Sequence, residues 1–201
     1  MLNPSLWVIG AEGDKEDDTM QTRTEKGGKN SEGPIGTGLV IERRFTTVGE
    51  DPFDQFDWIE MDVEIRNADG SLAHRIDDVR LPSGFSGVAG KVLAQKYLRK
   101  AGVPAILRKV KEKGVPTWLQ RSEPDHEKLQ SLDPEKRFIG ESHGRELFRR
   151  LAGTWTYWGW KHGYFEAEAD ARAYFDEMCY LIASQRSAPN SPQWFNTGLH
   201  W

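Results

Sequence analysis

AEADARAYFDEMCYLIASQR, residues 167–186, has the most regular apolar spacing in the chain. Its apolar side chains recur at the spacing of one helical face. They are Ala171, Tyr174, Phe175, Met178, Cys179 and Ile182. Asp170, Asp176 and Glu177 fall on the opposite side, where we expect solvent. The pattern predicts a helix packed on a core, with Cys179 as an inert small apolar side chain.

Two further helices are predicted before this one. Residues 142–158 carry an apolar stripe that should pack antiparallel to the first helix across the 159–165 connection. The stripe consists of Leu147, Leu151, Trp155 and Trp158. A shorter helix around residues 89–97 should end at Gly102 and Pro104. Between them, residues 108–134 are charged and broken by prolines, which predicts an exposed excursion.

The region before the helices has the pattern of β-structure. Ile59, Met61, Val63 and Ile65 alternate with polar residues, as in a half-buried strand. A turn at residues 67–70 precedes a second run, residues 72–81, that can pair back. The expected fold class is α+β: a β-hairpin region at 37–85, then a mainly helical segment at 86–186. Residues 1–36 have no apolar periodicity and are predicted to be a disordered leader.

Composition narrows the functional classes. The chain has 201 residues, a net charge of -4 and one cysteine. This balance is not that of a protein that coats nucleic acid or an anionic membrane. No apolar run approaches the roughly 20 residues that cross a bilayer, and the N-terminus lacks a signal-peptide pattern. We expect a cytoplasmic protein with no nucleic-acid or membrane partner. The five histidines lack metal-ligand spacing, so no metal site is predicted.

The last residues, 187–201, suggest a binding loop. Pro189 and Pro192 should stop the preceding helix and hold the backbone extended. Asn190 and Ser191 lie between them, and the aromatic residues Trp194 and Phe195 could anchor the loop. A hydroxyl and free backbone N–H groups there would suit an anionic oxygen such as a substrate phosphate. The alternative is a helix exit whose aromatic side chains only pack.

Several segments resemble one enzyme family. Residues 188–201, APNSPQWFNTGLHW, resemble the segment that enters the catalytic barrel of adenosylcobalamin-dependent ribonucleotide reductases. Other segments are similar to the N-terminal region of the same family. They are ERRFTT at 42–47, DPFD at 51–54, VPTWL at 115–119, LAGTWTYWGWK at 151–161 and GYF at 163–165. The resemblance runs from about residue 38 to the end.

The resemblance implies a function. Such enzymes make deoxyribonucleotides for DNA synthesis from ribonucleoside diphosphates or triphosphates. Adenosylcobalamin initiates thiyl-radical chemistry on a ten-stranded α/β barrel, and a thioredoxin-like protein supplies reducing equivalents. Residues 187–201 would begin that barrel, which is otherwise absent here. Ser191 is carried over as a substrate contact, and Asn190 and Asn196 are weaker candidates that could instead bond within the loop.

The resemblance also indicates which parts of the enzyme are expected outside this chain. Several cysteines are needed for the chemistry, and they are expected in the remainder of the reductase chain, with most of the cobalamin site. We therefore expect no catalytic residue here, and no activity from residues 1–201 alone. Two other readings stay open. One is a non-catalytic nucleotide-binding regulatory module. The other is an RNA-binding domain that uses the aromatic cluster at 155–160 and the basic run at 108–113, although that cluster better fits a core or domain interface.

Overall fold

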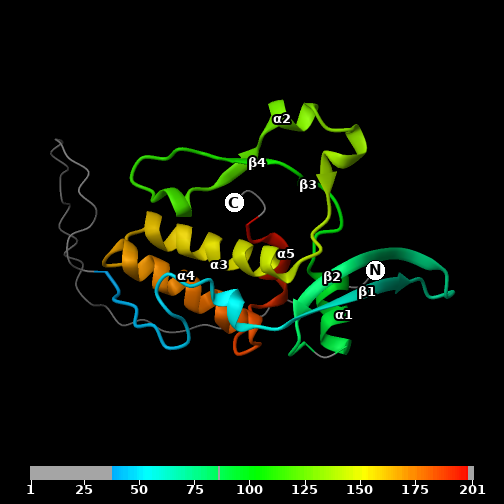
Figure 1. The fold of residues 1–201 in the computed structure, drawn as a ribbon, viewed down its shortest axis with the longest axis horizontal. Coiled ribbons are helices and arrows are strands. Elements are labelled where there is room, and N and C mark those ends of the chain that lie inside the picture. Colours follow the sequence, from blue (N-terminus) through cyan, green and yellow to red (C-terminus); the bar gives the residue numbers. More distant parts are fainter. Residues whose placement is uncertain (1–37, 86, 199–201) are drawn as a thin grey trace, which may run out of the picture. The chain divides into compact units, whose positions relative to one another are not determined.

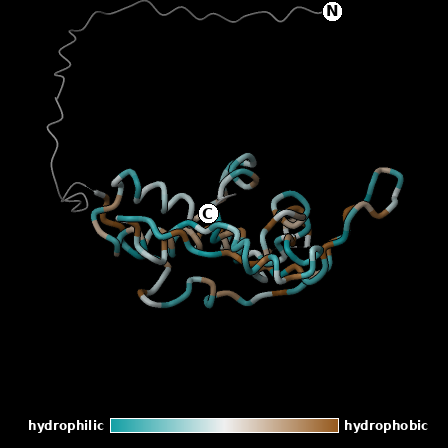
Figure 2. The backbone as a smooth tube through the Cα atoms, turned by 90° about the horizontal axis from the view of Figure 1, so that it is seen from above, coloured by the Kyte–Doolittle hydropathy of each residue, from teal (hydrophilic) through white to brown (hydrophobic). Residues whose placement is uncertain are grey.

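The computed structural model describes residues 38–85 and 87–198. The α+β class is confirmed, because a β-hairpin precedes a mainly helical part (Figure 1). The predicted leader at 1–36 and the last three residues, 199–201, lie outside the described residues. Figure 2 shows hydrophobic and hydrophilic residues interspersed along the described backbone. None of the helices in the described ranges has the length and apolar character needed to span a membrane.

The hairpin forms where the alternating pattern predicts it. Strand β1, Trp58–Arg66, pairs antiparallel with β2, Leu72–Pro82, and the register starts with Trp58 opposite Pro82. Along β1, the predicted inward residues are buried or half-buried, and the polar residues that alternate with them are exposed. Val63 on β1 is fully buried. The hairpin therefore presents one apolar face to the helices.

Three longer helices build the rest of the core. Helix α1 spans Gly87–Lys96, α3 spans Gly144–Lys161 and α4 spans Glu168–Ala183. The helices α3 and α4 lie side by side across a short connection, as predicted (Figure 1). A Cβ on Gly159 of α3 would lie 2.7 Å from the Phe165 ring, so only glycine permits this close approach. Cys179 on α4 is fully buried, and burial raises the pKa of its thiol well above the usual value, which agrees with an inert cysteine.

The prediction of an exposed excursion at 108–134 is wrong in part. Strand β4, Leu107–Lys109, pairs with β5, Ser122–Pro124, and the short strand β3, Val103–Pro104, pairs with β6, Phe138–Ile139. Leu119 is fully buried, and Val115 and Leu129 are nearly so. Pro116 and Pro134 start short helical turns, and Pro124 ends strand β5, two residues before another. These turns are η2, Thr117–Leu119, α2, His126–Gln130, and η3, Pro134–Lys136.

The α3 stripe is also only partly as predicted. Leu147 and Leu151 are fully buried, but Trp158 is 51% exposed. Trp158 keeps the correct helical spacing; the described residues simply do not cover that end of the face. It borders an apolar groove described below.

The expectation that Asp176 and Glu177 face solvent is wrong. Both side chains are buried, at 1% and 8% exposure. The Glu177 carboxylate accepts hydrogen bonds from the backbone N–H groups of Arg44, Phe45 and Thr46 at 3.1, 3.0 and 2.9 Å, and from the Thr46 hydroxyl at 2.7 Å. One carboxylate oxygen thereby fixes a whole turn of the N-terminal segment against α4.

A second acidic residue holds the neighbouring part of this segment. Asp176 forms an ion pair with Arg43 at 2.7 Å, and both groups are largely withdrawn from solvent. The turn continues into η1, Pro52–Gln55, which Asp51 caps by accepting a hydrogen bond from the Phe53 N–H. The acidic side of α4 is thus a docking face, because its charges find cations and N–H donors on residues 43–46.

Burial by itself would raise the pKa of Glu177, but the hydrogen bonds from Thr46, Phe45 and Arg44 outweigh it and leave the pKa below its ordinary value. Glu177→Gln should therefore lose about 1–3 kcal/mol of unfolding free energy at pH 7. The difference from the wild type should shrink as the pH falls through the folded-state pKa, below the ordinary glutamate value of about 4.3. Urea titrations at several pH values measure it. Glu42→Gln, an exposed neighbour, is the control; equal loss in both variants would contradict the assignment.

Candidate functional site: the C-terminal helix and its buried arginine

The predicted loop at the chain's end contains a short helix, α5, Ser191–Asn196. The expectation of extended backbone up to Pro192 is wrong, because Ser191 already belongs to the helix. Asn190 is the N-cap, with extended dihedral angles, and Pro192 lies in the first turn. Proline suits that position since its fixed φ is helical and its missing N–H has no partner there anyway. The double-proline pattern thus starts a helix.

The three predicted substrate-binding residues have different surroundings. Ser191 is exposed, and its hydroxyl lies 3.2 Å from the Tyr97 hydroxyl. The Asn190 side chain accepts a hydrogen bond from the Ser191 N–H at 2.8 Å, and the Asn190 backbone carbonyl accepts one from the Gln193 N–H at 2.9 Å. The predicted free backbone N–H groups are therefore engaged at these two positions. Asn196 is exposed on the last turn of α5, apart from the other two.

Aromatic contacts fix α5 on the core side. Trp194 is 7% exposed, and its ring stacks on Tyr97 at 5.1 Å. Its indole N–H donates to the Pro189 carbonyl at 2.9 Å. Phe195 also contacts Tyr97 but keeps 45% of its surface exposed. Of the two predicted anchors, Trp194 is buried and Phe195 is only half so.

A buried arginine holds α5 from behind, and the sequence reasoning missed it. Arg150 on α3 donates to the Thr197 carbonyl at 2.7 Å and to the Trp194 carbonyl at 3.2 Å. Its other nitrogens donate to the two Glu141 carboxylate oxygens at 2.8 and 3.1 Å. Arg150 and Glu141 are 6% and 5% exposed. A signal was present, because Arg150 lies within the apolar stripe between Leu147 and Leu151.

The chain leaves α5 by crossing Arg150 at close range. Gly198 has φ +78°, and a Cβ there would lie 2.3 Å from the Arg150 Cγ. Both the left-handed backbone and the lack of space require glycine. The same arginine thus sets the helix position and the direction of the chain after it.

An apolar groove of about 790 Å³ lies on the other side of the terminal segment. It runs between Leu39, the C-terminal end of α3 and residues 187–189. Its lining residues are Leu39, Ile41, Trp155, Trp158, Gly159, His162, Tyr164, Phe165, Tyr174, Met178, Ser187, Ala188, Pro189 and Gln193. Ser191 does not line it. The groove surface is mainly apolar, although tryptophan, tyrosine, histidine, serine and glutamine side chains along it carry N–H or O–H groups. Nothing in this lining is specific for a cobalamin, and we derive no step through that group.

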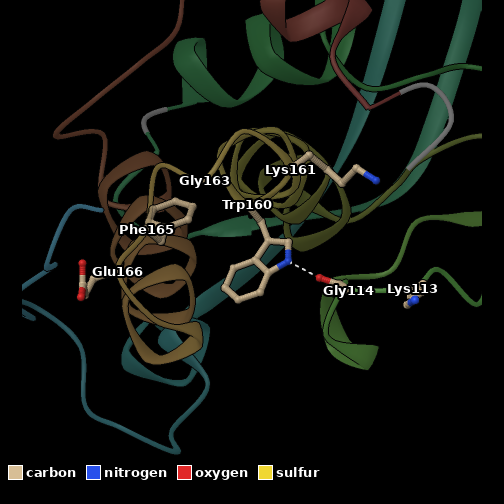
Figure 3. Close-up of a pocket in the computed structure, with 7 residues that line it drawn as sticks. All are labelled: Lys113, Gly114, Trp160, Lys161, Gly163, Phe165 and Glu166. Atoms are coloured by element: carbon tan, nitrogen blue, oxygen red, sulfur yellow. Dashed lines mark hydrogen bonds between the residues drawn. The ribbon is translucent and has the colours of Figure 1, made fainter. Parts of the chain in front are cut away.

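A smaller cavity of about 390 Å³ adjoins the end of α3. Figure 3 shows the Trp160 ring reaching toward the Gly114 carbonyl, to which its indole N–H donates at 2.6 Å. Nearby, Glu112 accepts from the Tyr157 hydroxyl at 2.7 Å and pairs with Lys161. These aromatic residues tie α3 to the 110–116 loop. They therefore serve internal contacts more than the stacking of bases.

Among residues 38–85 and 87–198, no three histidine, cysteine, aspartate or glutamate side chains are placed to share a metal ion.

Comparisons with known proteins identify the family. Residues 60–185 match the family model for "Class II vitamin B12-dependent ribonucleotide reductase". A vitamin B12-dependent ribonucleotide reductase of Bradyrhizobium diazoefficiens is 54% identical over 163 residues, and one of Agrobacterium fabrum is 53% identical over the same number. Each alignment covers 81% of this chain and 13% of the relative. One of Streptomyces avermitilis is 30% identical over 173 residues, covering 85% of this chain and 14% of the relative.

The chain therefore belongs to the class II vitamin B12-dependent ribonucleotide reductase family. It corresponds to the N-terminal portion of these much longer proteins, as the resemblance predicted.

Arg150→Met should lower the free energy of unfolding by about 3–5 kcal/mol, because it leaves the Glu141 carboxylate buried and unpaired. Adding Glu141→Gln should restore much of that loss, since the stranded charge is then removed. Thermal unfolding measures both. Arg149→Met is the matched control: its side chain is 47% exposed and pairs with Asp51 at the surface, so it should cost less than about 1 kcal/mol. Losses that simply add in the double variant would contradict the coupling.

Proposed function

We propose that this chain is the N-terminal part of a reductase that converts ribonucleotides to deoxyribonucleotides for DNA synthesis. Family membership supports the reaction class. The observation that carries the chain's own role is the exposed Ser191 hydroxyl on a helix that a buried arginine fixes from behind. A fixed polar group at a chain segment with little freedom is the arrangement that substrate positioning requires. The chain supplies a helical scaffold and a substrate-facing turn.

Ser191 would contact the phosphate end of a ribonucleoside diphosphate or triphosphate. Its hydroxyl can donate to a phosphate oxygen while it accepts from the Tyr97 hydroxyl 3.2 Å away. Asn190 would support it by orienting the first turn, because its side-chain oxygen is already bonded to the Ser191 N–H. Asn196 remains a weaker candidate, one and a half turns further along α5.

The radical chemistry would take place in the remainder of the reductase chain. Adenosylcobalamin would supply the radical when bound there, and a thioredoxin-like protein would supply the reducing equivalents in a cytoplasmic setting. The only cysteine here, Cys179, is fully buried on α4, which makes it unsuited to thiyl or disulfide exchange. We therefore assign the catalytic cysteines to residues that are not in this chain.

The apolar groove would receive part of that remainder. It holds Trp158, at 51% exposure, and Tyr164, at 60%. Exposed aromatic side chains gathered around an apolar hollow are typical of interfaces. The groove also adjoins residues 187–189, where the chain leaves α4 for the substrate-facing turn. Packing there would hold the turn and the catalytic part in one arrangement.

In the full-length reductase, Ser191→Ala should raise the KM for the ribonucleotide about tenfold, the effect of losing one hydrogen bond to a charged group. Affinity for adenosylcobalamin should not change. Ser83→Ala, at an exposed position away from the turn and the groove, is the control and should leave KM near the wild-type value. An unchanged KM in Ser191→Ala would contradict the phosphate contact. Residues 1–201 alone, given adenosylcobalamin and a dithiol, should form no deoxyribonucleotide.

Trp158→Asp should destabilise the full-length reductase by more than about 1 kcal/mol, because a charge would be buried in the packed groove. The same substitution in residues 1–201 should change the free energy of unfolding by no more than about 0.5 kcal/mol, since the side chain is exposed there. Chemical denaturation of both proteins makes the comparison. Val88→Asp, on an exposed position of α1, should be neutral in both. Equal effects of Trp158→Asp in the two proteins would contradict packing on the groove.

A further inference from the structure

A third cavity, of about 380 Å³, lies between the β4–β5 arm and the chain that follows α1. Two arginines line it, Arg99 from the segment after α1 and Arg121 from the position before β5, with Ser122 beside them. Its volume is in the range of cavities that hold small ligands. Neither the substrate-facing turn nor the apolar groove shares a residue with it.

Arg99 carries a charge that the described residues do not satisfy. Its Nε and Nη2 atoms are buried and have no hydrogen-bond partner among those residues. The carboxylate that could pair with it, Glu141, is already occupied: its two oxygens accept from Arg150, and one also accepts from the Arg99 backbone N–H at 2.9 Å. Burial lowers the pKa of Arg99 and the charge of Arg150 lowers it further, while the charge of Glu141 offsets part of this decrease. An unpaired buried guanidinium is costly, so such a group requires an explanation.

Arg121 adds a second cation at the same cavity. Its side chain is exposed and has no hydrogen bond or ion pair within the described part of the chain. Its charge lowers the pKa of Glu112, but that carboxylate does not line the cavity and is bonded to Tyr157 and Lys161. The one carboxylate that lines the cavity, Glu123, is paired with Arg108. The cavity therefore has two guanidinium groups and no free carboxylate to neutralise them.

We propose that this cavity binds a phosphate group, either as free phosphate or as part of a nucleotide, between Arg99 and Arg121. Arg121 is exposed and can offer paired N–H donors in the planar geometry that phosphate oxygens accept, and Arg99 adds a second positive charge at the cavity wall. The Ser122 hydroxyl provides a further donor on the cavity wall. A bound phosphate would supply the negative charge that Arg99 lacks. The site does not depend on the role proposed for Ser191.

Calorimetry of residues 1–201 with inorganic phosphate, ADP and adenosine tests this site. We expect saturable binding of phosphate and ADP and none of adenosine. Tighter binding of ADP than phosphate would identify a nucleotide as the source of the phosphate group, and equal binding would identify free phosphate. Arg121→Gln, an exposed substitution that should not affect folding, should weaken binding at least about tenfold.

Arg99→Met should weaken binding equally, and its melting temperature without phosphate should equal or exceed that of the wild type, because an unpaired buried charge has been removed. Arg66→Gln, which removes the same charge from the exposed hairpin, should bind like the wild type. The proposal is overturned if neither phosphate nor ADP binds saturably, if adenosine binds as well as ADP, or if Arg121→Gln binds with wild-type affinity. Loss of binding in Ser191→Ala with Arg121→Gln unaffected would move the phosphate to the substrate-facing turn.

Discussion

The buried ion pair between Glu141 and Arg150 is the contact on which the functional end of this chain depends. Through it, one carboxylate and one guanidinium connect four segments: the chain after α1, the chain after β6, helix α3 and helix α5. A buried pair contributes little net stability, because desolvation offsets most of the attraction between its charges. Its effect is geometric. The Nη1 group of Arg150 has its two acceptors only when the Trp194 and Thr197 carbonyls lie where they do, so the position of α5, and with it Ser191, follows from the position of Arg150.

A similar constraint holds the opposite side of the helical pair. Glu177 accepts hydrogen bonds from the backbone N–H groups of residues 44–46, and Asp176 forms an ion pair with Arg43. These contacts fix the segment that precedes the hairpin to α4. The two arrangements share a principle: a buried charge organises backbone groups that lack partners in regular structure. Together they explain how a polar chain builds a defined surface, with the turn at residues 190–191 and the apolar groove on adjoining parts of it.

The period of apolar residues was enough to predict the hairpin and the two long helices, because burial of one face dominates local structure there. Sequence patterns also singled out the segment that contains Asn190 and Ser191 as one held in place by aromatic side chains, and Trp194 is such an anchor. They failed where polar groups decide the structure. Asp176 and Glu177 were expected to face solvent, and the position of Arg150 within an apolar stripe was overlooked; even that position does not show which distant carbonyl or carboxylate the side chain will meet. The helix at 191–196 was missed because proline both ends and begins helices.

Amide hydrogen exchange in peptides that cover residues 190–198 tests the role of Arg150 most directly. If Arg150 fixes α5, the amides of this segment are protected in the wild type and exchange at least about tenfold faster in Arg150→Lys. A compact ammonium group lacks the planar fork that places separate nitrogens at the Glu141 carboxylate and at the two carbonyls. Peptides from α4, residues 168–183, should keep their protection in both proteins. Unchanged exchange at 190–198 in Arg150→Lys would contradict the account.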